Sequence, residues 1–300
     1  MKKNVAIVAG GHTGEDIISF ESAKTILANI NPEKWNVYYI TISKTEWLCF
    51  KDGQTLPLDR ADFSVSNADG SKVKMDYAYI IIHGAPGENG QLQGYFDLLK
   101  IPYSTGDHLN MAITFSKKAT TDILGKRGIN VAKSVESTDF DELKSKIIAE
   151  NLKYPVFIKP DSSGSSLGIS RIESESEIDD ALKKAFLESK IVMAEEGLFG
   201  TEVTCAIIKH EGELKPLPLI EIVSNNKYYD YDAKYNKQSQ EICPARISEE
   251  HTKIVQAEAL KIYKTLNCVG ICRVDFMLTD GGVPYVIEIN TIPGMSSESL

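Results

Sequence analysis

A segment near the C-terminus has the residue types and spacing of a metal-binding β-hairpin. Within residues 270–290, two apolar, strand-like runs flank Gly281-Gly282. This pair is typical of a two-residue type I′ turn, in which both central residues need positive φ. In the register that such a turn sets, Asp275 lies opposite Glu288. Because side chains alternate along a strand, both carboxylates are expected on the same polar face.

The polar face of this hairpin predicts a magnesium site. Two carboxylates directly opposite each other on a sheet repel, so Asp275 and Glu288 call for a cation between them. Asn290 adds a neutral oxygen on the same face, and Mg²⁺ prefers oxygen ligands shared with substrate phosphates. Arg273, opposite Asn290, suits a phosphate or carboxylate that bridges to the metal. The expected substrate is a nucleoside triphosphate; the alternative interpretation is a solvated polar face on an edge hairpin.

A second chemical signal is the Ser/Gly-rich loop that follows Lys159. Residues 161–168 separate two strand-like runs and are too many for a tight hairpin turn. Backbone N–H groups and hydroxyls in such a loop can surround phosphates, and Lys159 at its base would add positive charge. A flexible surface connection is the alternative interpretation.

The elements that position these residues indicate an α/β protein. Residues 1–103 alternate strand and helix signals, with strands at 5–9, 37–42 and 77–82 and a helix at 15–30, which predicts a parallel α/β domain. Residues 104–194 form a second predicted lobe, with a helix at 139–150 and a hairpin at 155–172. Residues 195–300 form a third, with strands at 202–208 and 217–222, a helix at 248–266 and the metal hairpin.

Composition narrows the class of protein. The chain has 300 residues, 42% hydrophobic content and a net charge of −9, so nucleic acid and anionic membrane surfaces are poor partners. Its apolar runs are shorter than the roughly 20 residues of a membrane helix, and we expect a cytoplasmic protein. The five cysteines include no CxxC pair and are expected as buried thiols. The glycines at 10, 11 and 14 lack GxGxxG spacing, which disfavours NAD binding.

Five motifs, in order along the chain, together resemble the D-alanine–D-alanine ligase family of the ATP-grasp superfamily. They are Gly10-Gly11 with Glu15 and Ser19; His83 to Gly90 with Gln93-Gly94; Lys159-Pro160 with Gly164 to Gly168; Tyr229 to Tyr235; and Arg273 to Asp275 with Glu288 to Thr291 and Pro293 to Met295. The resemblance implies a three-lobed ATP-grasp fold with an N-terminal Rossmann-like parallel α/β domain. It implies ATP between the second and third lobes, a lid around Tyr229 to Tyr235, and substrates against the first lobe.

The resemblance also implies a reaction. A D-alanine carboxylate takes the γ-phosphoryl group of ATP, and the amine of a second D-alanine then displaces phosphate. Two Mg²⁺ ions (Mn²⁺ being an alternative) are implied on Asp275, Glu288 and Asn290. The resemblance further implies that Lys117 and Lys159 bind phosphate and that Glu195, Leu198 and Glu202 line the adenine and ribose pocket. Arg273 and Gly294 are implied to stabilise the acyl carbon. Glu15, Ser165 and Tyr235 are implied to form a hydrogen-bond network, and His83, Lys234 and Ser299 to contact the substrates.

The alternatives concern both single residues and the activity. His83 could merely cap its strand, and Ser165 could serve its own loop. A ligase joining D-alanine to D-lactate or D-serine is the same-class alternative, and a catalytically silent ATP-binding regulatory protein is the alternative from a different class. Family members are usually homodimers and continue beyond the position of Leu300 with a further helix, which is expected to back the second-substrate site.

Overall fold

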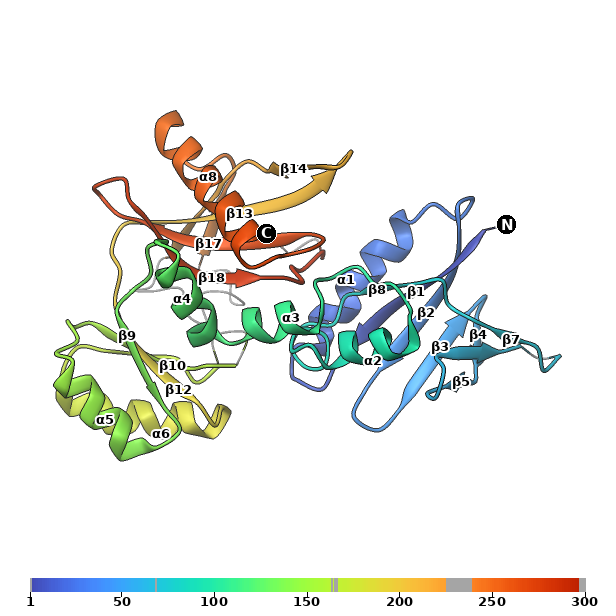
Figure 1. The fold of residues 1–300 in the computed structure, drawn as a ribbon, viewed down its shortest axis with the longest axis horizontal. Coiled ribbons are helices and arrows are strands. Elements are labelled where there is room, and N and C mark those ends of the chain that lie inside the picture. Colours follow the sequence, from blue (N-terminus) through green and yellow to red (C-terminus); the bar gives the residue numbers. More distant parts are fainter. Residues whose placement is uncertain (1, 68, 163, 165–166, 225–238, 297–300) are drawn as a thin grey trace. The chain divides into compact units, whose positions relative to one another are not determined.

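The structure, a computed structural model, describes residues 2–67, 69–162, 164, 167–224 and 239–296 (Figure 1). The chain divides into two compact units. The first unit consists of residues 1–112, 267–272 and 290–300, and the second of residues 113–266 and 273–289. The lobe boundaries expected after residues 103 and 194 stay a prediction. Among the described residues, no helix is both long and apolar enough to cross a bilayer.

The first unit is built on a five-stranded sheet in the order β4-β3-β2-β1-β8. The strands are β1 (Lys3–Gly10), β2 (Trp35–Ile42), β3 (Trp47–Lys51), β4 (Gln54–Leu56) and β8 (Tyr77–Ile80). β1 pairs in parallel with β2 and β8, which confirms the predicted parallel α/β core, while β3 and β4 extend it antiparallel. The apolar run of β1 is buried because a central parallel strand is covered on both faces.

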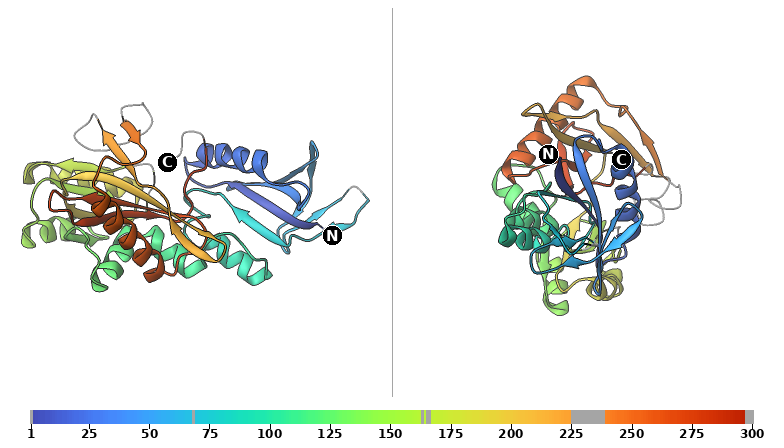
Figure 2. Two further views of the ribbon diagram at one scale, coloured as in Figure 1. Left: turned by 90° about the horizontal axis from the view of Figure 1, so that it is seen from above. Right: turned by 90° about the vertical axis from the view of Figure 1, so that its right-hand side faces the viewer.

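Helices and a small sheet complete this unit. Helix α1 (Asp16–Asn29), which confirms the helix expected at 15–30, lies along one face of the five-stranded sheet (Figure 2). The other elements are α2 (Gln91–Leu99), α3 (His108–Phe115), which ends in the second unit, and a three-stranded sheet of β5 (Leu58–Asp59), β6 (Ser64–Ser66) and β7 (Lys72–Val73). The hydroxyl of Ser19 on α1 accepts from Gly10 N at 2.9 Å and donates to the carbonyl of Ile81, so the helix is tied to the ends of β1 and β8.

The second unit contains two further sheets. One has the order β11-β10-β12-β9, with β9 (Ser134–Ser137), β10 (Val156–Pro160), β11 (Ser170–Ile172) and β12 (Val192–Glu196). The other has the order β16-β15-β13-β17-β18, with β13 (Thr201–His210), β15 (Ile220–Ser224), β16 (Ser239–Ile242), β17 (Cys272–Leu278) and β18 (Pro284–Asn290), and with β14 (Glu213–Pro216) also paired to β13. The antiparallel pairing of β10 with β11 confirms the predicted hairpin around the Ser/Gly-rich loop.

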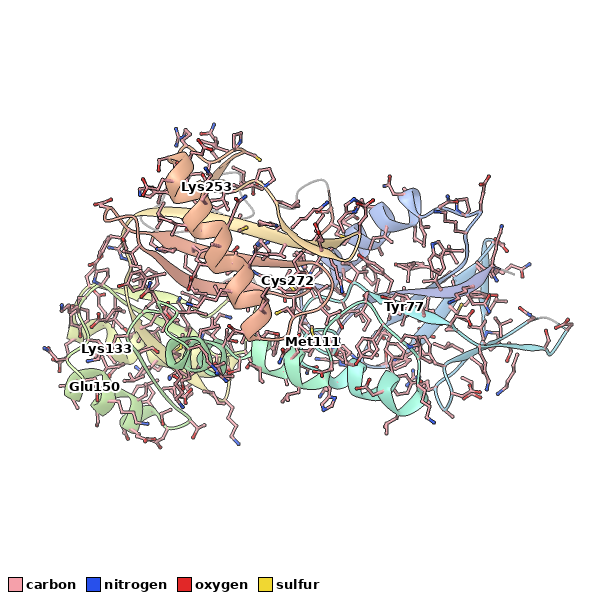
Figure 3. The ribbon with its side chains drawn as sticks, turned by 45° about the horizontal axis from the view of Figure 1, so that its top comes forward. Tyr77, Met111, Lys133, Glu150, Lys253 and Cys272 are labelled. Carbon is pink, nitrogen blue, oxygen red and sulfur yellow. The ribbon has the colours of Figure 1, made fainter. Side chains whose placement is uncertain are left out.

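Helices cover both sheets of this unit. α5 (Phe140–Ala149) and α6 (Ile178–Glu188), which follows a 3₁₀ turn at Glu175–Glu177, pack against the four-stranded sheet, and α4 (Lys117–Lys126) precedes it in the chain (Figure 1). α8 (Glu249–Thr265) lies across the strands of the larger sheet (Figure 3). The helices expected at 139–150 and 248–266 are confirmed. Each begins at a polar N-cap, where Asp139 and Ser248 accept backbone N–H groups.

Two sequence expectations about strands were wrong in detail. The strand expected from residue 217 begins only at Ile220, because the prolines at 216 and 218 cannot donate ladder hydrogen bonds. The hairpin of β17 and β18 does not turn through a type I′ pair at Gly281-Gly282. Gly282 N donates to Thr279 O at 2.8 Å, and Thr279 N donates to Val283 O at 3.1 Å. Only Gly282 of the two glycines has positive φ (74°), as in a three-residue loop with a glycine bulge.

Candidate active site

Charged side chains from both sheets of the second unit meet in one cluster. Lys159 near the end of β10 forms an ion pair with Glu195 of β12, and their side chains are only 10% and 11% exposed. These residues come together because β10 and β12 are adjacent antiparallel strands, in which Phe157 pairs with Glu195 and Lys159 with Met193. The lysine predicted to bind phosphate is thus held by the glutamate predicted for the nucleotide pocket.

The larger sheet contributes three carboxylates to the same cluster. Glu202 of β13 lies near Asp275 of β17 and Glu288 of β18, and Lys159 from the other sheet also acts on it. Burial, reinforced by the charges of Asp275 and Glu288, raises the pKa of Glu202 to about 7, against the opposing effects of Lys159 and Arg273. At the turn Thr279 pairs with Val283, one residue out of the predicted register, so the placement of Asp275 directly opposite Glu288 stays a prediction; both carboxylates act on Glu202. The cluster has an excess of negative charge.

Asp275 is held from two sides. Arg273, two residues earlier on β17, donates from Nε to Oδ1 and from Nη2 to Oδ2, each at 2.9 Å. The hydroxyl of Thr204 on β13 donates to the same Oδ1. A fork-like guanidinium contact of this kind orients a carboxylate as well as neutralising it. Arg273 therefore lies beside a predicted metal ligand, Asp275, to which it donates two hydrogen bonds.

The N-terminus of α4 adjoins the base of the Ser/Gly-rich loop. Asp161, directly after β10 and 1% exposed, accepts at Oδ1 from Lys118 N at 2.9 Å and from the Ser116 hydroxyl at 3.1 Å. Its carbonyl accepts from Lys117 N at 3.3 Å. The backbone of Lys117, the first residue of α4, is thereby bonded to Asp161, which lies two positions after Lys159 in the chain. The contacts of Asp161 place the start of α4 beside the end of β10, the strand that carries Lys159.

A separate set of polar residues lies in the first unit, at the carboxyl ends of β1 and β8. Glu15 occupies the position directly before α1, and its Oε2 lies so close to Gly84 that a Cβ there would be 3.2 Å from it. The Thr13 hydroxyl donates to the carbonyl of His83 at 3.4 Å, and Gly84 N donates to Glu88 at 2.8 Å. His83 itself is 7% exposed. The two N-terminal signatures thus meet at the edge where open α/β sheets bind ligands.

The remaining predicted residues are placed individually. Leu198 follows β12 and is half-buried, Asn290 is the last residue of β18, and Gly294 lies four residues beyond that strand. Ser165, Lys234, Tyr235 and Ser299, together with the predicted lid at 229–235, lie outside the described residues. Within the described ranges no three His, Cys, Asp or Glu side chains form a preformed metal-ligand group.

Comparison with known proteins decides the family. The family model described as D-ala D-ala ligase N-terminus matches residues 4–106, and that described as D-ala D-ala ligase C-terminus matches residues 123–300. The chain belongs to the D-alanine–D-alanine ligase family. It is 43% identical over 300 residues to a D-alanine–D-alanine ligase of Bacteroides fragilis, an alignment that covers all of this chain and 92% of the relative.

Solved ligase structures agree with this assignment. The VanG D-Ala:D-Ser ligase of Enterococcus faecalis superposes with a TM-score of 0.89 at 34% identity, covering 100% of this chain and 93% of that one. The D-alanine–D-alanine ligase of Bacillus anthracis complexed with ATP gives a TM-score of 0.76 at 28% identity, covering 100% and 89%. The predicted ATP-grasp fold is confirmed.

Two residues that support this ligase site were missed by the sequence interpretation. Thr204 donates to Asp275, and Asp161 joins α4 to the loop base. Thr204 lies two residues after Glu202, and alternate residues of a strand share a face, so its position could have been found from the periodicity of that strand. Asp161 follows Lys159-Pro160 directly, but its partners on α4 lie more than 40 residues earlier, and no local pattern indicates that contact.

Proposed function

We propose that the chain joins two D-alanine molecules to D-alanyl-D-alanine at the expense of ATP, for peptidoglycan precursor synthesis. The full-length match to D-alanine–D-alanine ligases carries this proposal. The charged cluster alone would suit many ATP-grasp enzymes, because it accounts for phosphate binding and not for the choice of acceptor. The amino-acid specificity therefore rests on the family, and the phosphate chemistry rests on the site.

The donor set of the cluster fits Mg²⁺. Asp275, Glu288 and Asn290 offer oxygen ligands, and the pKa of Glu202 is raised by burial and further by the charges of Asp275 and Glu288, which a cation would neutralise. Bound there, Mg²⁺ would offset the charge of the ATP phosphates. Lys159 and Lys117 supply further positive charge at the loop base. On this proposal, Lys159 gives up part of its ion pair with Glu195 and binds phosphate instead when ATP binds.

The transfer step consists mostly of positioning and charge stabilisation. One carboxylate oxygen of the first D-alanine bonds to the γ-phosphorus as the bond to ADP breaks, giving an acyl phosphate. The neutral amine of the second D-alanine then attacks the acyl carbon. The bond from that carbon to the phosphate oxygen breaks, phosphate leaves, and the nitrogen loses one proton to form the amide. Arg273, fixed by its fork contact with Asp275, and the N–H of Gly294 would stabilise the oxyanion at that carbon.

Substrate recognition is proposed on the first unit. Glu15 would bind the ammonium group of the first D-alanine, beside Gly84, where a side chain would block the approach. His83 would orient the carboxylate of that substrate, and the family roles of Ser165 and Tyr235 would complete the network with Glu15. Lys234 and Ser299 would receive the carboxylate of the second D-alanine.

Three further features are proposed from the family. Glu195, Leu198 and Glu202 would line the adenine and ribose pocket, with Glu202 between that pocket and the metal site. The protein is proposed to act in the cytoplasm, where ATP and D-alanine are available. We also propose a homodimer, which sedimentation of the purified chain would test.

The test is product analysis with several acceptors. Purified chain, ATP and Mg²⁺ are incubated with D-alanine alone, with D-alanine plus D-lactate or D-serine, and with L-alanine as the matched control. We expect phosphate release with D-alanine and a dipeptide with the mass and retention time of D-alanyl-D-alanine. A mixed product with D-serine or D-lactate in preference to the D-alanine dipeptide would overturn the acceptor assignment, and ATP binding without turnover would favour the regulatory alternative.

A further inference from the structure

Two cysteines of the first unit lie side by side in the segment between α8 and β17. Cys268 is 7% exposed and Cys272, the first residue of β17, is fully buried. Each thiol shifts the pKa of the other, which places the two sulfurs close to each other. Cys272 is labelled in Figure 3. Both cysteines are reduced in this structure, and neither has a role in the ligase chemistry proposed above.

The backbone of this segment holds the two thiols together. Gly270 between them has φ of 78°, and a Cβ there would lie 2.4 Å from the carbonyl oxygen of Ser104. Ser104 is itself anchored to β8, since its hydroxyl accepts from Ile80 N at 2.9 Å. The positive φ of Gly270 turns the chain at this point, and the thiol of Cys272 lies 3.9 Å from the carbonyl oxygen of Val269, on the other side of the turn.

The surroundings distinguish the two sulfurs. The side-chain amide of Asn110 donates to Cys268 Sγ at 3.7 Å. Interaction with Cys272, and then with Asn110, lowers the pKa of the Cys268 thiol. Interaction with Cys268, together with burial, raises the pKa of the Cys272 thiol. Cys268 is also the more exposed of the two, next to Val269, which is 50% exposed. One sulfur is suited to react first and the other to resolve the product.

We propose that Cys268 and Cys272 form a peroxide-sensitive disulfide site that switches the ligase reversibly. The sulfur of Cys268 attacks one oxygen of hydrogen peroxide, the O–O bond breaks, and a sulfenic acid and one water result. The sulfur of Cys272 then attacks Cys268 Sγ, the S–O bond breaks, and a second water leaves with the thiol proton. Two thiols lose two electrons and two protons, and one peroxide becomes two waters. A small dithiol reverses the reaction.

The effect on activity rests on the proposed function. Cys272 directly precedes Arg273, whose fork contact orients Asp275. A bond from Cys268 to Cys272 would draw the first residue of β17 toward the Gly270 turn. Arg273 would move with it, and displacements of about 1 Å at a catalytic group are enough to lower rates strongly. We expect the oxidised protein to lose most of its ligase activity and to regain it on reduction.

The disulfide can be read directly in one peptide. Trypsin cleaves after Lys264 and Arg273, so the peptide of residues 265–273 contains both cysteines and no other. The full chain carrying Cys243→Ser, which removes the exposed thiol, is treated with hydrogen peroxide, alkylated and digested. We expect the peptide to lose two hydrogens, to resist alkylation, and to revert with dithiothreitol. Buried Cys205, whose pKa burial raises to about 12, should stay reduced as an internal control.

Other results would overturn the proposal. A peptide that stays doubly alkylated, or that gains oxygen atoms on one cysteine, excludes the disulfide. A disulfide that forms while the rate of phosphate release is unchanged excludes the switch. Cys272→Ser should keep the initial rate and lose the response to peroxide, with Cys268→Ser as the second variant if the first is unstable. An inactive reduced protein would contradict the proposed function, while the peptide mass still decides the disulfide.

Discussion

Replacing Glu202 by glutamine should make the metal-free protein more stable at alkaline pH. Glu202 lies beside Asp275 and Glu288, and burial together with these charges raises its pKa from 4.5 to about 7. At about 1.36 kcal/mol per pH unit, keeping this glutamate ionised in the folded chain costs up to about 3 kcal/mol above pH 7. Glutamine has nearly the same shape and no charge, so Glu202→Gln should recover most of that free energy.

The sign follows from proton binding. Between about pH 4.5 and 7 the folded chain holds a proton on Glu202 that the unfolded chain has released, so the free energy of unfolding falls as pH rises through this range. Below about pH 4.5 both states are protonated and the effect disappears. The difference in stability between Glu202→Gln and the parent should therefore grow from pH 5 to pH 8.

Urea denaturation in EDTA, at pH 5 and at pH 8, measures this difference. Glu213→Gln, at an exposed position of β14, is the matched control and should parallel the parent at both pH values. Saturating Mg²⁺ should narrow the gap between Glu202→Gln and the parent at pH 8, because a cation repays the cost of the crowded carboxylates. Parallel curves for the Glu202 variant and the parent would refute the reasoning.

Further variants test other parts of the site. Glu288→Gln should abolish most Mg²⁺-dependent phosphate release while thermal unfolding stays close to the parent; full activity in a folded variant would contradict the metal assignment. Asp161→Ala removes the acceptor at the start of α4 and should lower the free energy of unfolding in urea by about 1–3 kcal/mol. Gly84→Ala would bring a Cβ to 2.7 Å from the Thr13 hydroxyl at φ of 69° and should raise KM for D-alanine, as initial rates would show. Tyr235→Phe should gain D-alanyl-D-lactate synthesis at acidic to neutral pH, and an unchanged product ratio would remove Tyr235 from acceptor choice.

Much of the site could be predicted from the sequence because its signals are local. Two strand-like runs around Gly281-Gly282 placed Asp275 and Glu288 on the two strands of one hairpin, and an apolar run before Gly10 indicated a central parallel strand. Polar residues before apolar periodic runs marked the starts of α5 and α8. Alternation, apolar runs and caps each depend on neighbours within a few residues, so no knowledge of distant contacts was needed.

The tertiary structure decided which charges meet. Gly281-Gly282 is compatible with a two-residue type I′ turn and with a three-residue loop that ends in a glycine bulge. The structure has the second, with positive φ at Gly282. Lys159 pairs with Glu195, and the pKa of Glu202 is raised by burial and by the charges of Asp275 and Glu288, because separate strands of the second unit converge. Coulomb energy and desolvation act through space, between residues that lie tens of positions apart in the chain. Residue types and their spacing limit which side chains the site can use, whereas the partners and the protonation of those side chains depend on the folded chain.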